Sequence, residues 1–334
     1  MSVFAPVISS LWIHLEEYGI DPAPLFKKHG IEALPPFDPN MRVSSIKLDR
    51  ILAEAAERSG DPSFGLKEAK YFLPSHLGPL GFAWLASTSL QSAFERLQRY
   101  IHVLHERMEV SISDESGALV VGMHVNAESV NYFERDISIL ATLVKMCRFI
   151  AGENWSPAKV TFSHPAPVDT SYFFQLFRCP VEFDAMLNGI HVDSQQAAEH
   201  LTGSNKQMAQ LNDHMVIRYL AARSKSDIVS RVKALILEHL GEGGICESVV
   251  AQDLHMSTRS LNRKLTAANT SFKTLLLETR SELASQYIND PGLTLTEITY
   301  MLGFSEISSF SRAYKRWTGQ SPSAARKLKL DKRP

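Results

Sequence analysis

Two groups of side chains near the C-terminus have the residue types that read the edges of DNA bases. An arginine can donate two hydrogen bonds to the major-groove edge of guanine, an asparagine can pair with adenine, and a serine can contact either base. The predicted base-contacting residues are Arg259, Asn262 and Arg263 in the first group and Ser308, Ser309 and Arg312 in the second.

Hydroxyl and basic side chains flank both groups. Such side chains commonly contact phosphate oxygens, which position a protein on the duplex without reading its sequence. For Lys315 and Arg316, a solvated helix end is the simpler alternative. The predicted phosphate-contacting residues are Ser257, Thr258, Lys264, Ser305, Lys315 and Arg316.

An internal repeat positions the two groups. A shift of 48 positions aligns apolar and small residues of the last 90 residues with one another, and the match continues after one extra residue. Each copy predicts a supporting helix, a tight turn and a second helix with a polar, basic face, which is a helix-turn-helix. The matched pairs are Val250 with Ile298, Ala251 with Thr299, Leu254 with Leu302, Met256 with Phe304, Ser257 with Ser305, Leu261 with Phe310, Arg263 with Arg312 and Leu265 with Tyr314.

We expect the first unit over residues 247–266 and the second over residues 295–317. Ser257 can cap the second helix of the first unit. Thr294 and Glu297 have the spacing of a capping box, so the next supporting helix should begin at Leu295 and end near Gly303. Ser305 should then open the last helix. A generic three-helix core can imitate one such unit, but two copies at a fixed offset favour the helix-turn-helix.

An amphipathic pattern over residues 271–289 predicts a helix that joins the two units. At about 1.5 Å per residue it would be roughly 28 Å long. Such a rod could set two recognition helices about one duplex turn apart, which is roughly 34 Å. One chain would then read two successive major-groove segments.

Charge and composition divide the chain. Residues 1–226 carry 20 Lys and Arg against 25 Asp and Glu, whereas residues 227–334 carry 15 against 11, so the basic excess lies at the C-terminus. We place the domain boundary in the small, polar segment 221–227, between helical patterns over residues 205–220 and 228–240. The chain shows no export signal and no membrane span. Three widely spaced cysteines fit neither a disulfide framework nor a metal pair, which indicates a reducing cytoplasm.

The N-terminal part, residues 1–225, is predicted to be an α+β domain built around an antiparallel sheet. Helical patterns cover residues 49–59, 90–108 and 133–151, and a hairpin is expected at 110–125 with its turn at 114–117. Short strands are expected at 158–163 and 181–183. The C-terminal domain, residues 226–334, is predicted to be all α.

The sequence contains no motif that indicates catalysis or metal binding. His102, His105 and Glu106 would share one face of a helix, but no third His or Cys stands at ligand spacing, so a structural or surface role is the better interpretation. No nucleophile motif frames the available Ser, Cys and His residues. We therefore expect neither an enzyme nor a cofactor.

The C-terminal hundred residues resemble the AraC/XylS family of bacterial transcription regulators. The similarity covers nearly all of residues 298–323 and includes Arg280; Thr299 departs from the usual alanine, which would loosen the helix crossing slightly. Segments 60–66, 76–82, 87–90 and 181–184 resemble the "arabinose-binding-like" N-terminal domain of one subgroup. That domain differs from the sugar-binding domain of the arabinose regulator, so the resemblance does not imply arabinose as a ligand.

The resemblance implies a DNA-binding regulator, expected to be an effector-responsive activator that forms a homodimer and contacts RNA polymerase. It also implies that the six base-contacting positions named above face the DNA. A constitutive or protein-gated regulator without a ligand cavity remains the alternative. Some DNA alkylation-repair proteins carry a similar DNA-binding domain, but they need a cluster of cysteines that Cys147 and Cys179 cannot supply.

Overall fold

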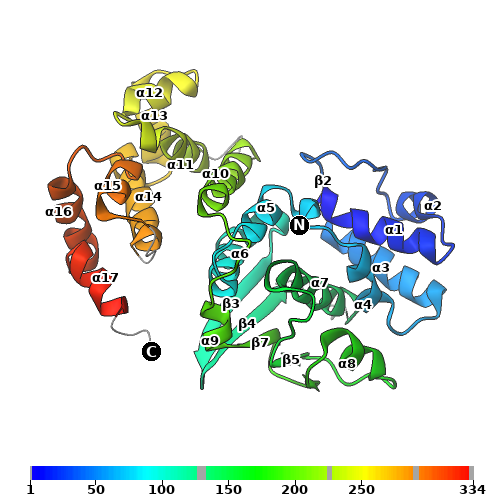
Figure 1. Ribbon diagram of the computed structural model, residues 1–334. Helices are drawn as coiled ribbons and strands as arrows, with labels where there is room; N and C mark the ends of the chain where they lie inside the picture. Colours follow the sequence, from blue (N-terminus) through cyan, green and yellow to red (C-terminus); the bar gives the residue numbers. More distant parts are fainter. Residues whose placement is uncertain (1, 126–132, 224–227, 289–292, 331–334) are drawn as a thin grey trace. The chain divides into compact units, whose positions relative to one another are not determined.

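A computed structural model describes residues 2–125, 133–223, 228–288 and 293–330 (Figure 1). The chain divides into two compact units, Met1–Val216 and Ile217–Pro334. The division falls within helix α10 (Lys206–Arg223). The predicted boundary segment 221–227 lies partly outside the described residues, at 224–227.

The N-terminal unit contains a five-stranded sheet in the order β3-β4-β7-β5-β6. The hairpin of β3 and β4 pairs Met108 with Val125 at its open end and Glu115 with Ala118 at its turn. Ser116 and Gly117 both have positive φ, of 54° and 86°, as a two-residue type I′ turn requires. The predicted hairpin is therefore confirmed. The strands are β3 (Met108–Glu115), β4 (Ala118–Val125), β5 (Lys159–Thr161), β6 (Val181–Glu182) and β7 (Asn188–Asp193).

The sheet is mixed, which corrects the expectation of an antiparallel one. β4 and β5 each pair with β7 antiparallel, but β5 and β6 run parallel. The chain between β5 and β6 contains α8 (Ser171–Phe177), which returns the chain to the same end of the sheet. A separate two-stranded sheet joins β1 (Ser2–Phe4) and β2 (Arg42–Ser44).

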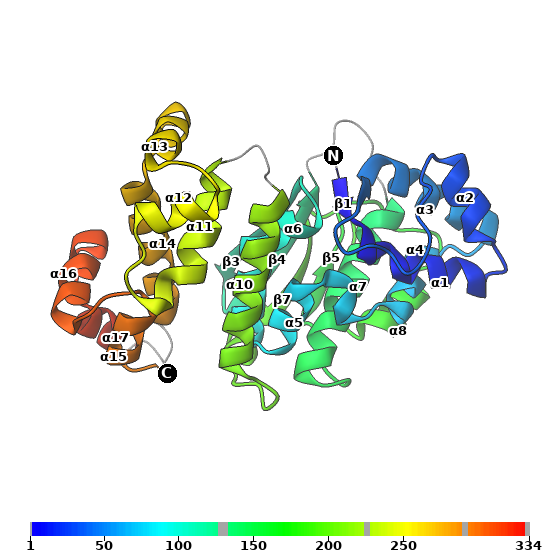
Figure 2. The same ribbon diagram turned by 90° about the horizontal axis from the view of Figure 1, so that it is seen from above.

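Helices make up the rest of this unit, and the long helix α7 packs against α3, α4, α5 and β7 (Figures 1 and 2). The α-helices are α1 (Ser9–Glu17), α2 (Pro22–Lys28), α3 (Ser45–Ser59), α4 (Phe64–Glu68), α5 (Pro79–Leu85), α6 (Leu90–Leu104), α7 (Phe133–Ala151), α8 and α9 (Ser194–Ala198). Three 3-10 turns accompany them, at Ala5–Ile8, Ala69–Tyr71 and Pro74–Leu77.

Helix α6 ends at Leu104, four residues before the predicted end. His105 takes an extended conformation, with φ −141° and ψ 118°, and forms an isolated bridge with Val3 before β3 begins. His102, His105 and Glu106 therefore do not share one face of a helix. This corrects the expectation on which a possible metal site was considered. His102 is exposed, whereas His105 is buried.

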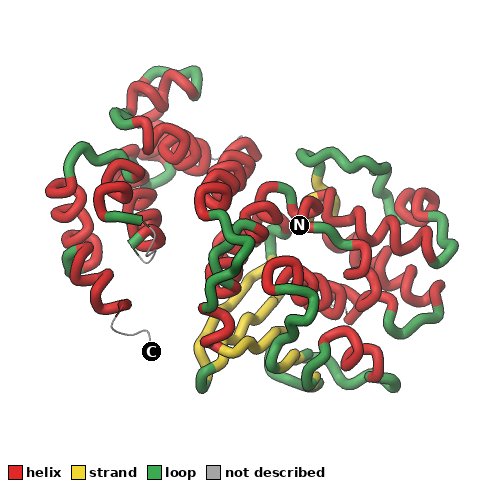
Figure 3. The backbone as a smooth tube through the Cα atoms, viewed as in Figure 1, coloured by secondary structure: helices red, strands yellow, loops and turns green. Residues whose placement is uncertain are grey.

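The C-terminal unit is entirely helical within the residues described (Figure 3). Its core gathers apolar residues from its helices, among them Ile236, Leu261, Leu275, Ile298 and Phe310. The elements are α11 (Ile228–His239), η4 (Leu240–Glu242), α12 (Glu247–Asp253), α13 (Thr258–Ala267), α14 (Phe272–Tyr287), α15 (Leu295–Met301), α16 (Ile307–Thr318) and α17 (Pro322–Leu330). Across the part of the chain that is described, no helix is long and apolar enough to span a bilayer.

Candidate nucleic-acid interface and N-terminal cavities

Helix pairs α12–α13 and α15–α16 share one turn geometry. His255 and Gly303 stand at matching positions of the repeat, and both have positive φ, of 55° and 68°. The amide of the following residue donates to the equivalent carbonyl of the supporting helix in each unit. Met256 N donates to Ala251 O and Phe304 N donates to Thr299 O, both at 3.0 Å. The sequence repeat is therefore a repeat of backbone geometry as well.

The recognition helix of the first unit, α13, buries one face and exposes the other. Leu261 and Leu265 are completely buried and anchor the helix to the core. Ser257 is the N-cap, and its side chain accepts a hydrogen bond from Ser260 N at 3.2 Å, as predicted. The exposed residues of α13 and its cap include Ser257, Thr258, Arg259, Asn262, Arg263 and Lys264.

The recognition helix of the second unit, α16, has the same two faces. Phe310 and Tyr314 are buried, and the ring of Trp317 lies 6.3 Å from that of Phe304. The helix begins at Ile307 with Glu306 as its N-cap, so the expectation that Ser305 opens it is wrong. The extra residue of the second copy lies at this N-terminus. Ser305, Ser308, Arg312, Lys315 and Arg316 are exposed, and Ser309 is half-buried.

Contacts within each unit hold some of these side chains. The Asn262 amide donates to the carboxylate of Glu247 on α12. Arg312 Nη2 lies 3.4 Å from Ser309 Oγ, and Ser308 Oγ donates to Glu306 Oε2 at 3.0 Å. The sequence did not identify the carboxylates of Glu247 and Glu306 as neighbours of the predicted base-contacting residues. Glu247 and Asn262 are 15 residues apart, so only the packing of α12 against α13 brings them together.

The supporting helix of the second unit is capped as predicted. Thr294 and Glu297 form both reciprocal hydrogen bonds of a capping box, Glu297 N to Thr294 Oγ1 at 3.1 Å and Thr294 N to Glu297 Oε2 at 2.7 Å. The Thr299 hydroxyl, which replaces the expected alanine, is buried and donates to Leu295 O at 2.7 Å. Its polar atom is thereby satisfied inside its own helix.

Helix α14 connects the two helix-turn-helix units, and its buried face packs in the core of the C-terminal unit. It spans Phe272–Tyr287, with Ser271 as its N-cap, and is about 24 Å long at 1.5 Å per residue. Residue 289, the predicted end, lies outside the described residues. Arg280 on this helix donates to Leu302 O at 2.9 Å and to Gly303 O at 3.0 Å. Burial lowers the pKa of Arg280 from its usual value.

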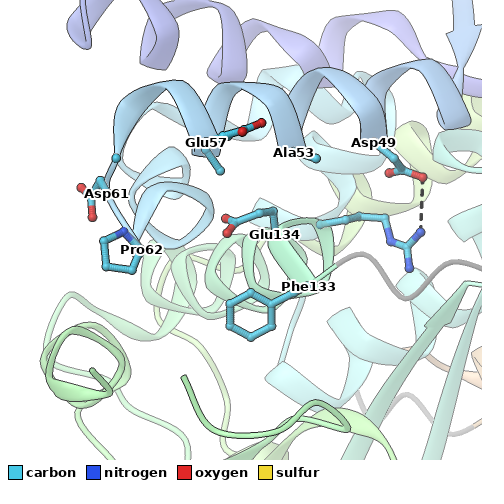
Figure 4. Close-up of a pocket in the computed structure, with 10 residues that line it drawn as sticks. Asp49, Ala53, Glu57, Asp61, Pro62, Phe133 and Glu134 are labelled. Atoms are coloured by element: carbon cyan, nitrogen blue, oxygen red, sulfur yellow. Dashed lines mark hydrogen bonds and ion pairs between the residues drawn. The ribbon is translucent and has the colours of Figure 1, made fainter. Parts of the chain in front are cut away.

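The N-terminal unit contains a pocket rich in carboxylates, which we call the acidic pocket (Figure 4). Its volume is about 510 Å³, and it lies between α3 and the first turn of α7. Burial raises the pKa of Glu134 to about 7, although its carboxylate accepts a hydrogen bond from Gly65 N at 3.0 Å. The lining residues are Asp49, Ala53, Ala56, Glu57, Gly60, Asp61, Pro62, Phe133, Glu134 and Arg135.

A second cavity, of about 210 Å³, lies among α1, α3, α6 and α7, and we call it the apolar cavity. Most of its lining is aliphatic or aromatic, including Leu52, Phe72 and Trp84. Its charged lining residues are Asp49, Glu68 and Arg135, and its neutral polar ones are Ser10, Ser45, His105, Ser138 and Thr142.

The two cavities share the ion pair between Asp49 and Arg135. Arg135 Nη1 lies 3.3 Å from Asp49 Oδ2, and its Nε lies 2.9 Å from Asp136 Oδ1. Asp136 also accepts hydrogen bonds from His164 at 2.8 Å and Asn188 at 3.0 Å. Burial raises the pKa of Asp49 to about 6, because the nearby guanidinium offsets only part of the desolvation. Sequence reasoning did not find these cavity residues.

These features define a protein of two units, in which a cavity-bearing α+β unit is followed in the sequence by a pair of helix-turn-helix units. Comparison with known proteins agrees. The family model "Arabinose-binding domain of AraC transcription regulator, N-term" matches residues 19–201, and a model of a helix-turn-helix domain matches residues 250–328. The chain belongs to the AraC family of DNA-binding transcription regulators.

Curated relatives span the whole architecture. The chain is 29% identical to the ornithine utilization regulator of Pseudomonas aeruginosa, over 92% of this chain and 91% of that protein. It is 25% identical to the transcriptional regulator VirS of Mycobacterium tuberculosis, over 94% of both chains. The crystal structure of the regulator CdpR from Pseudomonas aeruginosa covers 96% of this chain and 98% of its own, with 20% identity and a TM-score of 0.48.

Proposed function

We propose that this protein is an effector-responsive transcriptional activator that acts as a homodimer in the bacterial cytoplasm. Residues 226–334 bind DNA, residues 1–225 sense a small molecule and dimerise, and the bound protein contacts RNA polymerase. The observation that carries this proposal is the repeated geometry of α12–α13 and α15–α16, in which each second helix exposes a polar, basic face. In the proposal, α13 and α16 enter two successive major-groove segments.

Base reading is assigned to Arg259, Asn262, Arg263, Ser308, Ser309 and Arg312. Phosphate contacts are assigned to Ser257, Thr258, Lys264, Ser305, Lys315 and Arg316. Eleven of these side chains are exposed and Ser309 is half-buried, which supports both assignments, because a fully buried side chain could not reach DNA. The phosphate contacts supply affinity that falls with salt concentration, and the base contacts supply discrimination.

Binding-site selection with two matched variants tests these roles. Arg312→Ala should relax the preference at one base position and cost about 1–3 kcal/mol for the best site. Lys315→Ala, one turn later on the same helix, should weaken all sequences alike and reduce the salt slope by about 1. An Arg312→Ala protein that keeps every base preference would refute the assignment.

The apolar cavity supports small-molecule sensing over the constitutive or protein-gated alternative. Effector sites are typically concave and largely apolar, with a few polar groups that fix orientation, and this cavity has that composition. An effector must bind two states of the protein with different affinity in order to shift their equilibrium. In our proposal those states differ in dimerisation or in how the N-terminal unit constrains the DNA-binding unit.

Transcription from a reporter, DNA affinity and oligomeric state should therefore change when an effector is added. Ornithine is a reasonable first probe, because one relative is a regulator named for ornithine utilization. A compound that binds the full chain but leaves all three measurements unchanged would favour the constitutive alternative.

A further inference from the structure

Glu68 is a buried charged residue that lines the apolar cavity. Its side chain accepts hydrogen bonds from Ser10 Oγ at 2.8 Å and from Ser138 Oγ at 2.6 Å, which connect α4 to α1 and α7. The residue is 9% exposed, and burial raises the pKa of its carboxyl group. Within the described residues, no Lys, Arg or His forms an ion pair with it.

Among the residues described, no other group that lines the apolar cavity provides a counter-ion for Glu68. Arg135 is already paired with Asp49 and with Asp136 outside the cavity. Burial and the nearby Arg135 and Arg42 lower the pKa of His105 to about 4, so its imidazole is neutral near pH 7. The cavity therefore holds one carboxyl group that is supported by two neutral hydroxyls and has no counter-ion among the residues described. A buried carboxylate is stabilised by hydrogen bonds to its charged form and most strongly by a positive partner, whereas desolvation alone favours the protonated, neutral form.

We propose that the apolar cavity binds a small primary amine with a compact apolar body, whose ammonium group pairs with Glu68. This inference rests on the proposed function, in which the N-terminal unit senses a small molecule. The ammonium supplies three donors, and Glu68 retains acceptor sites beyond the two hydroxyl contacts. The aliphatic and aromatic wall receives the rest of the ligand, since Leu52, Phe72 and Trp84 offer no hydrogen bonds that a more polar body would need.

The cavity volume limits the size of this amine. An apolar cavity of about 150 Å³ accommodates a benzene molecule. At about 210 Å³, this one has room for a ring and a short chain, but not for a long polyamine or a nucleotide.

A purely structural Glu68 and an amine site in the acidic pocket are the two alternatives. Glu68 could serve only to join α1, α4 and α7 through its two serines, in which case no amine would bind. An amine could instead bind the acidic pocket, where Glu57 and Asp61 also offer carboxylates. Glu57 is exposed, so a change there tests the second pocket without disturbing the core.

The test is calorimetric titration of the full-length protein with three compounds of one shape, namely 2-phenylethylamine, 2-phenylethanol and phenylacetate. We expect the wild type to bind the amine at least tenfold more tightly than the alcohol or the acid. Glu68→Gln keeps the shape of the side chain and removes the charge; its amide oxygen can accept from one serine, and its NH2 group can donate to the hydroxyl oxygen of the other. This variant should weaken amine binding about 10- to 100-fold. Glu57→Gln should leave amine binding unchanged.

Equal binding of the three compounds, preference for the acid, or no binding of the amine to the wild type would each overturn the proposal, and none of these results depends on a variant. Loss of amine binding in Glu57→Gln alone would assign the amine to the acidic pocket instead. Amine binding without any change in transcription would support the cavity assignment and contradict effector-responsive regulation. DNA binding by the full chain is measured separately from amine binding. Failure of the proposed amine site can therefore be distinguished from failure of the proposed regulatory function.

Discussion

The guanidinium of Arg280 lies 4.5 Å from the centre of the Phe304 ring, directly above the turn of the second helix-turn-helix unit. From that position it also donates to the carbonyls of Leu302 and Gly303, the two residues that follow the last residue of α15. One side chain of α14 therefore satisfies two carbonyls of the turn and contacts its aromatic residue.

Arg280→Met should destabilise the C-terminal unit by about 2–3 kcal/mol, because two partly buried carbonyls lose charged donors. Arg280→Lys should recover only part of this loss, since a lysine ammonium lacks the planar, forked geometry that reaches both carbonyls from above a ring. Urea unfolding of the full chain, followed by helix content, measures the effect. Lys273→Met, on an exposed position of the same helix, is the control and should change stability little. An Arg280→Lys protein as stable as the wild type would show that the forked geometry contributes nothing.

Gly303 and His255 provide a matched test of the turn, because they occupy the same repeat position with positive φ. Gly303→Ala should cost roughly 1–3 kcal/mol, since alanine is strained at this φ and its Cβ would lie 2.5 Å from Leu240 O. His255→Gly should be neutral or slightly stabilising, because glycine adopts this conformation without strain. Thermal unfolding compares the two. A neutral Gly303→Ala would show that the turn relaxes more readily than this geometry indicates.

Glu247 holds Asn262 by a hydrogen bond, so a carboxylate lies beside a residue to which we assign base reading. Glu247→Gln should keep that contact and remove a negative charge that repels the DNA backbone. We expect roughly two- to fivefold tighter binding to all sequences at low salt, with the gain lost as salt rises. Glu247→Ala should also release Asn262 and alter the preference at one base position. Fluorescence anisotropy across a salt series measures both effects. An unaltered preference in Glu247→Ala would separate Asn262 from base reading.

The second helix-turn-helix unit could be predicted almost completely from the sequence, since its signals are local. Apolar periodicity, a capping box and the Gly303 turn all act within a few residues of one another. The predicted start of α16 at Ser305 is wrong, because the extra residue of the second copy shifts the N-cap to Glu306. Helical periodicity predicts which side chains of these helices face outward, and the six proposed base-contacting side chains are exposed or half-buried.

The N-terminal cavity could not be predicted, because its polar groups come from distant segments. Ser10, Glu68 and Ser138 meet only after α1, α4 and α7 pack together. Strand β7 escapes prediction for a different reason, since its ends are polar and it contains Gly189. The alternation of buried Ile190 and Val192 with half-buried His191 is the signal that could have revealed it.

His105 should make the stability of the N-terminal unit depend on pH. Its folded pKa of about 4 lies below the unfolded value of about 6.5, so the unfolded state binds more protons between these values. Stability from this residue is therefore fully present above about pH 6.5 and is lost as pH falls toward 4, by about 3 kcal/mol in total. Protonation of Nδ1 would also break the hydrogen bond that it accepts from Arg107 N at 3.2 Å.

The unfolding free energy of wild type, His105→Gln and His102→Gln should be compared from pH 4 to 7. His105→Gln should flatten the profile relative to the wild type, whereas His102→Gln, at an exposed position, should leave it unchanged. The raised pKa of Asp49 makes stability increase as pH falls, in the wild type and in His105→Gln alike. Only the difference between the two stability profiles therefore reports on His105. Parallel profiles for wild type and His105→Gln would contradict the linkage.

Homodimer formation, which we propose, has a specific candidate surface on α10. Met208, Leu211 and Met215 are spaced by three and four residues and are 47%, 53% and 48% exposed, so one helix face presents apolar side chains to solvent. A second copy of the same helix would bury them in the manner of a paired amphipathic helix. Leu211→Glu should weaken self-association at least tenfold, because it would place like charges at the centre of the contact.

Sedimentation equilibrium of the full chain measures this self-association. Gln175→Glu, a change at an exposed position of α8, is the matched control for added charge and should leave the association constant nearly unchanged. A wild-type protein that is monomeric at micromolar concentration, or a Leu211→Glu protein that associates as tightly as the wild type, would remove α10 from the proposed dimer. Equal weakening by both variants would instead trace the effect to net charge, since only Leu211 belongs to the apolar face.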